Sequence, residues 1–396
     1  MSVYLGGNKI TPLYLGGVEI AEAFFGSVRI YPDYNPLNLP AHTMRFQFSN
    51  ASFNPSTSGI SFKSGATWTQ VSSSPNVWDY TRVAQNNSWE DEFYNRLTQL
   101  NIGGTYSVLG ANTAGLTNMT YIFWKNDALT SVCLFDTTSA TTTYGMFSEC
   151  SSITTVPLFD LSRVTETKMM FFRCTSLSSV PLFNLSNATN VGGMFAFCSS
   201  LSAVPLFDLS SATDIHEMFS YCTSISTVPQ FNTSSVTIAA GLFWGCTNLT
   251  SVPMLDLSHA YRTESMFMEC SSLRSVPLYD LSSSTTTYSM FRDCSALETA
   301  PLFNLSRVRD AKNMFAGCHS LQSVPLYDLS SVVYTYQMFD SCYNVESGAL
   351  ALYNQVSTQT NPPTSHADMF YDCGVSTVSG RAELALIPAS WGGLGA

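Results

Sequence analysis

Nine cysteines recur along this chain at one fixed interval, and this period constrains the fold more than any other feature of the sequence. They lie 24 residues apart, in eight equal intervals without insertion: Cys150, Cys174, Cys198, Cys222, Cys246, Cys270, Cys294, Cys318 and Cys342. A period of this length predicts a solenoid, in which each repeat is one coil stacked on its neighbours. Because a single coil cannot bury its own apolar side chains, the core must run along the whole stack.

The consensus of one coil indicates how its residues are used. It reads Met-Phe-x-x-Cys-x-Ser-Leu-x-Ser-Val-Pro-Leu-Phe-Asp-Leu-Ser-x-x-Thr, followed by four variable residues. We expect Val-Pro-Leu-Phe to form a short strand, although its proline cannot donate to a ladder. We expect the variable residues and Met-Phe-x-x-Cys to form a short helical or turn segment that packs behind this strand. Coils about 4.8 Å apart would align equivalent residues into ladders.

The cysteine ladder has a structural and a metal-binding interpretation. Cysteine is a small, frequently buried side chain that could fill a narrow corner of every coil. Zinc would need close pairs such as C-x-x-C, yet the closest two cysteines, Cys133 and Cys150, are 17 residues apart. The sequence therefore favours the structural role and predicts no metal.

An acidic slot follows the aromatic residue of each coil, and Asp and Asn interchange there. Its occupants are Asp160, Asn184, Asp208, Asn232, Asp256, Asp280, Asn304 and Asp328. Interchange predicts a hydrogen bond from the backbone to a side-chain oxygen that both residues carry. Contact with calcium or a glycan is one alternative, and a carboxylate pair that cleaves glycans is another.

The aromatic slot itself recurs in nearly every coil. It holds Phe159, Phe183, Phe207, Phe231, Tyr279, Phe303 and Tyr327, and is broken by Leu255. We expect these rings to be buried, because an exposed stripe of this size would cause aggregation unless a partner covered it. The alternative is an exposed aromatic face that binds sugars or proteins.

Both ends of the repeat depart from the consensus. The first coil has Asn126 in the cysteine slot and Cys133 in the proline slot, as a capping coil would. Near the other end, the motif returns at Cys373 after 31 residues, so seven inserted residues around 361–364 should bulge from one face. Residues 375–396 are expected to close the solenoid as a cap.

Composition excludes several classes of function. Only 11% of the residues are charged and the net charge is -11. The basic residues are scattered singly, so no phosphate-binding cluster is present and we expect no nucleic acid partner. The sequence has no apolar run of about 18 residues and its first residues do not read as a secretory signal. We therefore expect no membrane insertion, and synthesis in a cytoplasm.

The first thirty residues contain three related decapeptides. Each has an aromatic-apolar strand, a glycine turn and a returning strand, which together predict a small β-meander over residues 1–33. The aromatic-apolar pairs are Tyr4 and Leu5, Tyr14 and Leu15, and Phe24 and Phe25. Because strands this short bury little, we expect a trimer or docking onto a larger assembly to stabilise them.

Residues 34–110 are expected to form a small connecting α+β domain after the prolines at 32, 36 and 40. Residues 44–48 and 59–62 alternate as half-buried strands do. Ser88 should begin a helix whose apolar stripe is Trp89, Phe93, Leu97 and Leu100.

The repeat resembles the BspA-like class of leucine-rich repeats over about residues 119–374, on the run Met-Phe-x-x-Cys-x-Ser-Leu-x-Ser-Val-Pro-Leu-Phe-Asp. That class occurs in bacterial surface antigens and in virion proteins of phages, and it implies a binding surface rather than a chemistry. The N-terminal decapeptides look like the opening segment of phage tail and fibre proteins. This likeness implies a virion-attachment element.

Enzyme motifs are missing from the sequence: it has no H-E-x-x-H, no G-x-S-x-G, no P-loop and no dinucleotide fingerprint. The variable residues around each Met-Phe are a better indication of function, because the coil does not dictate them. Stacked, they would form one surface, either ordinary solvated surface or a recognition surface. Our candidate anchors are Trp244, Tyr288, Tyr334, Tyr336, Tyr221, Phe197, Arg262 and Arg292.

These observations predict an α+β protein: a leucine-rich-repeat-like solenoid of 24-residue coils over 111–374, preceded by the meander and the connecting domain. The expected function is that of a phage virion structural protein, a fibre or tail protein that displays a receptor-binding face without enzymatic activity or cofactor. Its expected partners are other virion proteins, a host cell-surface glycan or protein, and further copies of itself. The alternatives are a head decoration protein, a glycan depolymerase and a bacterial surface adhesin.

Overall fold

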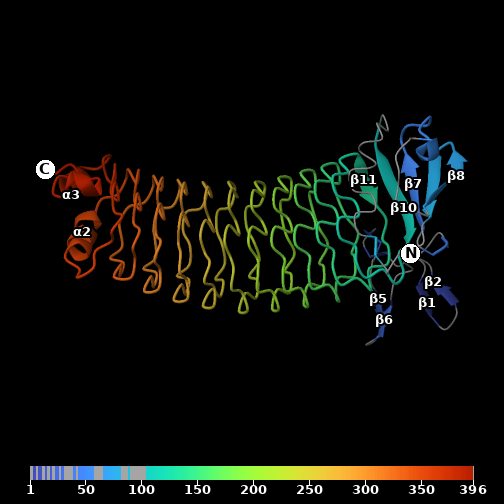
Figure 1. Cartoon of the computed structure of the whole chain (residues 1–396), viewed down its shortest axis with the longest axis horizontal. Helices are drawn as coiled ribbons and strands as arrows, with labels where there is room; N and C mark the ends of the chain where they lie inside the picture. Colours follow the sequence, from blue (N-terminus) through green and yellow to red (C-terminus); the bar gives the residue numbers. More distant parts are fainter. Residues whose placement is uncertain are drawn as a thin grey trace.

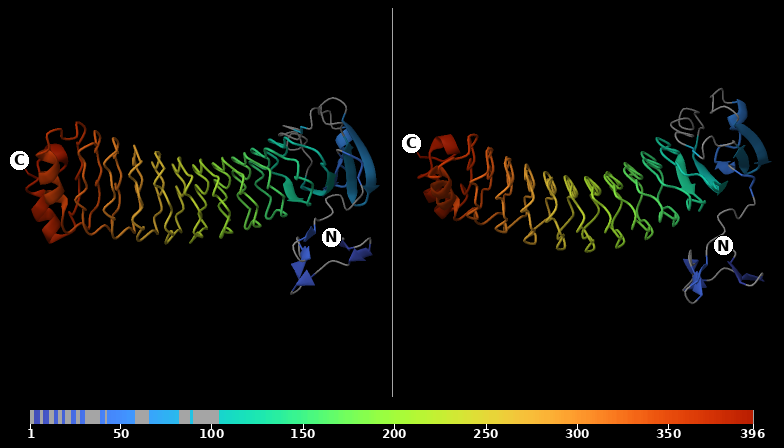
Figure 2. Two further views of the ribbon diagram at one scale, coloured as in Figure 1. Left: turned by 90° about the horizontal axis from the view of Figure 1, so that it is seen from below. Right: turned by 60° about the horizontal axis from the view of Figure 1, so that its bottom comes forward.

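The computed structural model describes residues 39–41, 43–57, 66–81, 88–89 and 104–395, together with six short strands between residues 3 and 30. The coils stack side by side along one gently curved axis (Figures 1 and 2). The N-terminal strands and a mixed sheet lie at one end of the stack, and two helices lie at the other. The longest described helix has nine residues, and none that is described could cross a bilayer.

Three antiparallel hairpins lie at the N-terminal end. They pair β1 (Val3–Leu5) with β2 (Asn8–Ile10), β3 (Tyr14–Leu15) with β4 (Val18–Glu19), and β5 (Ala23–Phe25) with β6 (Val28–Ile30). The predicted strand pairing within each decapeptide is confirmed. However, the hairpins form three separate two-stranded sheets instead of one meander, because strands of two or three residues have no face wide enough to recruit a neighbour.

A five-stranded mixed sheet joins this end to the solenoid. Its strands are β7 (Thr43–Phe48), β8 (Thr67–Ser73), β9 (Asn76–Thr81), β10 (Tyr106–Asn112) and β11 (Leu129–Val132), in the order β11-β10-β7-β9-β8. In β7, alternate residues Met44, Phe46 and Phe48 are buried, which confirms the predicted strand. The strand predicted at 59–62 lies outside the described residues, and so does the predicted helix apart from its first residues, Ser88 and Trp89. Trp89 is buried, as its place in the apolar stripe predicted.

The sheet continues into the first coil. The predicted boundary at residue 110 falls within β10, and β10 pairs in parallel with β11, which belongs to that coil. Asn126, in the cysteine slot of the same coil, is buried and donates its side-chain amide to the carbonyl of Phe123 at 2.8 Å.

One ladder of phenylalanines forms the centre of the solenoid. The rings of the Met-Phe motif stack without interruption from Phe123 to Phe370, with neighbouring centroids 5.3–6.0 Å apart. The aromatic slot packs against this stack, as Phe159 does on Phe147 at 5.8 Å. Every member of that slot from Phe159 to Tyr327 is at most 4% exposed, which confirms the burial expected for it.

The strand predicted at Val-Pro-Leu-Phe is wrong. After β11, the described coils contain only isolated parallel bridges. Most of them join the residues four positions before Met in neighbouring coils, such as Thr142 and Glu166, and one joins Ser323 to Ser347. Proline cannot donate to a ladder. The amide of the aromatic residue donates to the carbonyl of the proline two residues earlier, as Phe159 does to Pro157 at 3.0 Å. The other prediction, a turn segment at Met-Phe-x-x-Cys, is confirmed.

The cysteine and acidic slots behave as their composition predicts. Each of the nine in-phase thiols is fully buried and donates to the carbonyl of the Met-Phe phenylalanine one coil earlier, at 3.0–3.2 Å. Each Asp or Asn of the acidic slot accepts the backbone N–H two residues later, at 2.9–3.2 Å. Both slots are structural.

Two helices close the C-terminal end. The helix α2 (Ala349–Ser357), which the sequence did not predict, ends before residues 361–364, where the insertion was expected, and α3 (Val378–Leu384) packs beside it. The carboxylate of Glu383 accepts the N–H of Leu350 at 3.0 Å and so satisfies the first turn of α2. After α3, the short helix η2 (Ala389–Trp391) places the indole of Trp391 on the ring of His366, with centroids 3.9 Å apart.

Candidate recognition face

The variable residues lie on the side of the coil that carries the densest backbone ladder. In most coils, four alternate amides donate to carbonyls of the next coil. In one coil these bonds run from Thr167 to Asn190, Met169 to Gly192, Phe171 to Met194 and Arg173 to Ala196, at 3.1, 2.9, 2.9 and 2.8 Å. Because the backbone ladder and the inward side chains hold the coils together here, the outward side chains are free to vary.

We define the recognition face as the outward positions of this segment: two before Met-Phe and two after it. In the coil of Cys174 these are Glu166, Lys168, Phe172 and Arg173, which are half-buried or exposed, while Thr167 between them is buried. The residues just before Met and just before Cys adopt left-handed backbone conformations in every coil, as Met169 (φ 57°) and Arg173 (φ 58°) do. This repeated turn gives each coil the same arrangement of outward positions.

Three of the predicted anchors form one cluster. The rings of Phe197 and Tyr221 stack with centroids 4.8 Å apart, and Trp244 lies 5.4 Å from Tyr221. The sequence interpretation missed Phe172, 5.5 Å from Phe197, and Arg173, whose guanidinium covers both phenylalanines at 5.2–5.3 Å. The sequence contained an indication of both residues, because Phe172 occupies the same slot as Trp244 and Arg173 the same slot as Tyr221. We call these five residues the aromatic strip.

Two other predicted anchors lie farther along the solenoid. Tyr288 and Tyr334 are 38% and 43% exposed, and the ammonium of Lys312 lies between them, 5.6 and 5.1 Å from their ring centroids. Lys312 also pairs with Asp310 at 3.2 Å. The face therefore presents a cation held between two accessible rings. Tyr336, the next anchor, is half-buried.

The two predicted arginine anchors pair with carboxylates of their own coil. Arg262 forms an ion pair with Glu264, and Arg292 lies 3.3 Å from Asp293. Neither joins the aromatic strip, because each has a carboxylate within two residues. The structure thus brings Phe197, Tyr221 and Trp244 together, and places Tyr288 with Tyr334, but it does not unite all eight anchors.

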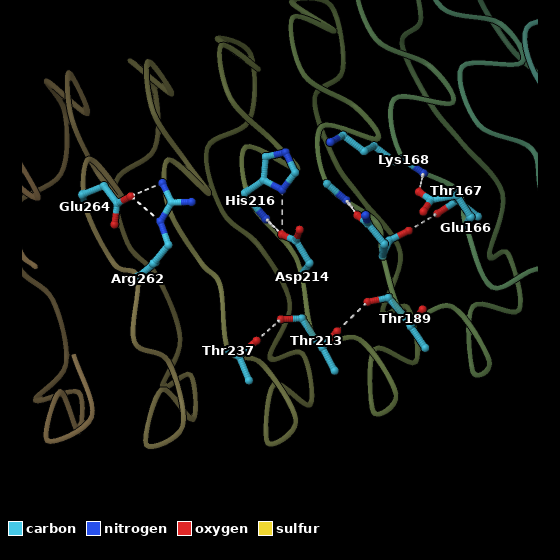
Figure 3. Close-up of polar contacts among 12 residues, drawn as sticks. Glu166, Thr167, Lys168, Thr189, Thr213, Asp214, His216, Thr237, Arg262 and Glu264 are labelled. Carbon is cyan, nitrogen blue, oxygen red and sulfur yellow. Dashed lines mark hydrogen bonds and ion pairs between the residues drawn. The ribbon is translucent and has the colours of Figure 1, made fainter. Parts of the chain in front are cut away.

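Polar residues of the face form short chains of contacts (Figure 3). The ring Nδ1 of His216 donates to the carboxylate of Asp214, 2.6 Å away. Although burial acts to raise the pKa of Asp214, its hydrogen bonds with His216 hold that pKa below the ordinary value. Burial raises the pKa of Glu166, two coils away. Along one edge, threonine hydroxyls donate to the carbonyl one coil earlier, as Thr213 does to Thr189 at 3.2 Å.

Two observations bear on metal binding and on glycan cleavage. Among the described residues, no three His, Cys, Asp or Glu side chains are grouped so that they could hold a metal. Asp256 and Asp280 line one groove, but hydrogen bonds from Ser258 and Ser282 lower the pKa of each. A glycosidase acid needs a raised pKa, so this carboxylate pair is poorly suited to that role.

Comparison with known proteins identifies a repeat family. Residues 92–205, 189–301 and 248–352 match the family described as "Mycoplasma protein of unknown function, DUF285". No curated protein matches the sequence. A solved structure of a leucine-rich repeat protein from Eubacterium ventriosum is 14% identical, with a TM-score of 0.28, and the likeness covers 57% of this chain and 93% of that one.

Proposed function

The chain belongs to the family described as Mycoplasma protein of unknown function, DUF285, and we propose that it is a recognition protein whose solenoid presents the face defined above to a partner on a cell surface. In the fuller form of this proposal, the chain is a structural protein of a phage virion, a fibre or tail component. It contacts other virion proteins through its N-terminal hairpins and a host glycan or protein through its solenoid.

The observation that carries the proposal is the contrast between a constant backbone and variable side chains. Every coil offers the same outward positions, yet these hold the aromatic strip in one region and the Tyr288–Lys312–Tyr334 group in another. Core packing requires neither group. Aromatic rings combined with a cation are typical of binding hot spots, and solenoids use extended faces of this kind for binding.

The geometry of the rings favours a particular mode of contact. In the aromatic strip, the faces of Phe197 and Tyr221 cover each other, with an angle of 8° between the planes. The strip therefore offers ring edges and a guanidinium. Tyr288 and Tyr334 are more accessible, so we propose that they make the first contacts with the partner, with the strip extending the footprint.

Position within the molecule supports the virion part of the proposal. The hairpins that contain Tyr4 and Leu5, Tyr14 and Leu15, and Phe24 and Phe25 lie at the end opposite the C-terminal cap. Attachment at that end would leave the recognition face and the cap projecting outward.

Binding of the full chain to host cells or to isolated surface glycans tests the recognition role. The double variant Tyr288→Ala/Tyr334→Ala should reduce binding at least tenfold. Tyr261→Ala is a matched control, because Tyr261 is equally exposed at 44% but lies in the threonine slot outside the variable positions. Equal binding by all three proteins would contradict the proposed face.

Electron cryomicroscopy of phage particles tests the virion role. We expect residues 1–33 in a tail or capsid socket and the solenoid outside. A chain absent from particles but present on a bacterial surface would indicate the adhesin instead. Cleavage of host glycan by the purified chain would indicate the depolymerase.

A further inference from the structure

The leucine that follows proline in each coil points to solvent. Four of these leucines are exposed by 57–59% and Leu326 by 52%, and Met254 replaces leucine in one coil at 49%. The row thus formed, which we call the Pro-Leu row, is Leu182, Leu206, Gln230, Met254, Leu278, Leu302 and Leu326, with the half-buried Leu158 before it.

The local backbone explains why this leucine faces outward. The amide of Phe183 turns back to the carbonyl of Pro181 at 2.9 Å, and the same bond recurs in most coils. This turn puts the aromatic ring in the core and leaves Leu182 at its outer tip. The leucine is therefore not needed to fill the solenoid.

The exposed area is large for a protein without a partner. Six apolar side chains of roughly 100 Å² each, aligned with half-buried prolines, reach the upper end of the about 300–600 Å² that the largest apolar patch of a monomer usually exposes. Their sum approaches the about 800 Å² per partner of a standard interface. The row also borders a groove of about 780 Å³, whose lining includes Leu206, Gln230, Met254 and Leu278.

We propose that the Pro-Leu row is an interface between two copies of this chain, which pack antiparallel about a twofold axis. A second copy carries the same row at the same coil spacing, so the apolar side chains of the two rows can pack against each other in register. A partner helix has a pitch of about 5.4 Å, and a partner strand has same-face side chains about 6.6 Å apart. Neither period matches the spacing of the coils, so the contacts of such a partner would lose register along the row.

Gln230 sets the register of the proposed dimer. It is the one polar residue in the row between Leu158 and Leu326. If the axis passes through it, the two Gln230 amides bond to each other, as a single buried amide fixes register in coiled coils. Leu206 then meets the partner's Met254, and Leu182 meets the partner's Leu278. Any other register would bury the amide against apolar side chains.

The first test measures the molar mass of the full chain in solution as a function of concentration. We expect a dimer for the natural chain, and at least a hundredfold weaker association for Leu206→Asp/Leu278→Asp. Leu386→Asp is the matched control, because Leu386 is 66% exposed in the C-terminal cap and should leave the dimer intact. A monomer or trimer at all concentrations would overturn the proposal, as would a dimer unaffected by the double variant.

The second test locates the axis by crosslinking. In Gln230→Cys, diamide takes two hydrogens from the two introduced thiols and leaves one disulfide between copies. The nine in-phase native thiols are buried, and Leu386→Cys controls for random collision. We expect a covalent dimer of Gln230→Cys alone. Failure to crosslink in a solution that contains dimers would contradict a twofold axis at this residue.

Discussion

At the scale of single residues, each coil depends on backbone conformations that suit glycine better than other residues. In the slot before Met, Gly193 has φ 59° and Gly241 has φ 62°, but Ser289 holds the same conformation with φ 52°. A left-handed conformation costs a residue with a Cβ about 1–2 kcal/mol. Ser289 is also fully buried, and its hydroxyl has no hydrogen-bond partner in the described part of the chain.

Replacing this serine should therefore stabilise the solenoid. We expect Ser289→Gly to raise the free energy of unfolding by about 1 kcal/mol. The relief of backbone strain stabilises the folded state, and the greater freedom of glycine in the unfolded chain offsets part of this gain. Gly193→Ala is the reverse control and should lower it by a similar amount, because the nearest atom to an added Cβ is 3.4 Å away and leaves room for it. Urea denaturation measures both, and a loss of stability in Ser289→Gly would contradict the argument.

The buried thiols lead to a second residue-scale prediction. Burial raises the pKa of Cys174 and Cys246 to about 12, so about one thiol in ten thousand is ionised at pH 8. We expect iodoacetamide to leave the nine in-phase cysteines of the folded protein unmodified, and to modify all eleven cysteines in urea. Mass spectrometry reads the result. Rapid native labelling of any in-phase cysteine would mean that its coil opens.

At the scale of the element, the turn after the aromatic slot is held by one side-chain oxygen, and Asp and Asn both supply it. Asp208, Asp256, Asp280 and Asp328 have pKa values lowered first by the hydroxyl and then by the amide of the serine two residues later. Asn184 makes the same bond to the amide of Ser186 at 3.1 Å. The turn therefore needs the oxygen and not the charge.

Acid sensitivity follows from these four carboxylates. Because folding lowers their pKa values, they stabilise the folded state above pH 4, and this contribution is lost as the pH falls through the lowered values. Replacing all four by Asn should leave the melting temperature near its original value at pH 7 and reduce the loss of stability between pH 5 and 3. Thermal melts at pH 7, 5 and 3 measure this difference. An equally steep acid loss would show that other carboxylates dominate.

At the scale of the whole molecule, the solenoid has one continuous core without a boundary between coils. The phenylalanine stack, the thiol bonds and the four-bond ladder all join each coil to the next in the same way. Stability should therefore depend on the number of neighbouring coils in phase.

Deleting residues 271–294 removes one complete coil. It joins Cys270 to Ser295, which normally follows the equivalent cysteine, Cys294. We expect the shortened chain to fold with the same circular dichroism spectrum and a modestly lower melting temperature. Deleting residues 271–282 is the matched control, since half a coil places the remaining core residues out of phase and should prevent folding of the C-terminal part. Two deletions of equal effect would argue against stacking in phase.

Much of this architecture follows from the sequence alone. A strict period forces equivalent residues into ladders, so burial of the Cys and aromatic slots and the turn at Asp or Asn could be predicted before any coordinates. The variable residues were correctly located around Met-Phe, but their grouping was not. Phe172 and Arg173 share an aromatic strip with Phe197 because adjacent slots of neighbouring coils lie side by side, and a pattern along the chain does not contain that distance.

Tertiary structure alone decided which apolar residue of Val-Pro-Leu-Phe faces water. Leu182 and Phe183 are both apolar, so hydrophobicity favours burial of each. The turn of Phe183 onto Pro181 and the space beside the Met-Phe rings admit only the ring. The same competition for space made the strand prediction fail, and it left the Pro-Leu row on the surface. The period thus determined that the coils stack, whereas packing between coils determined which faces they offer to other molecules.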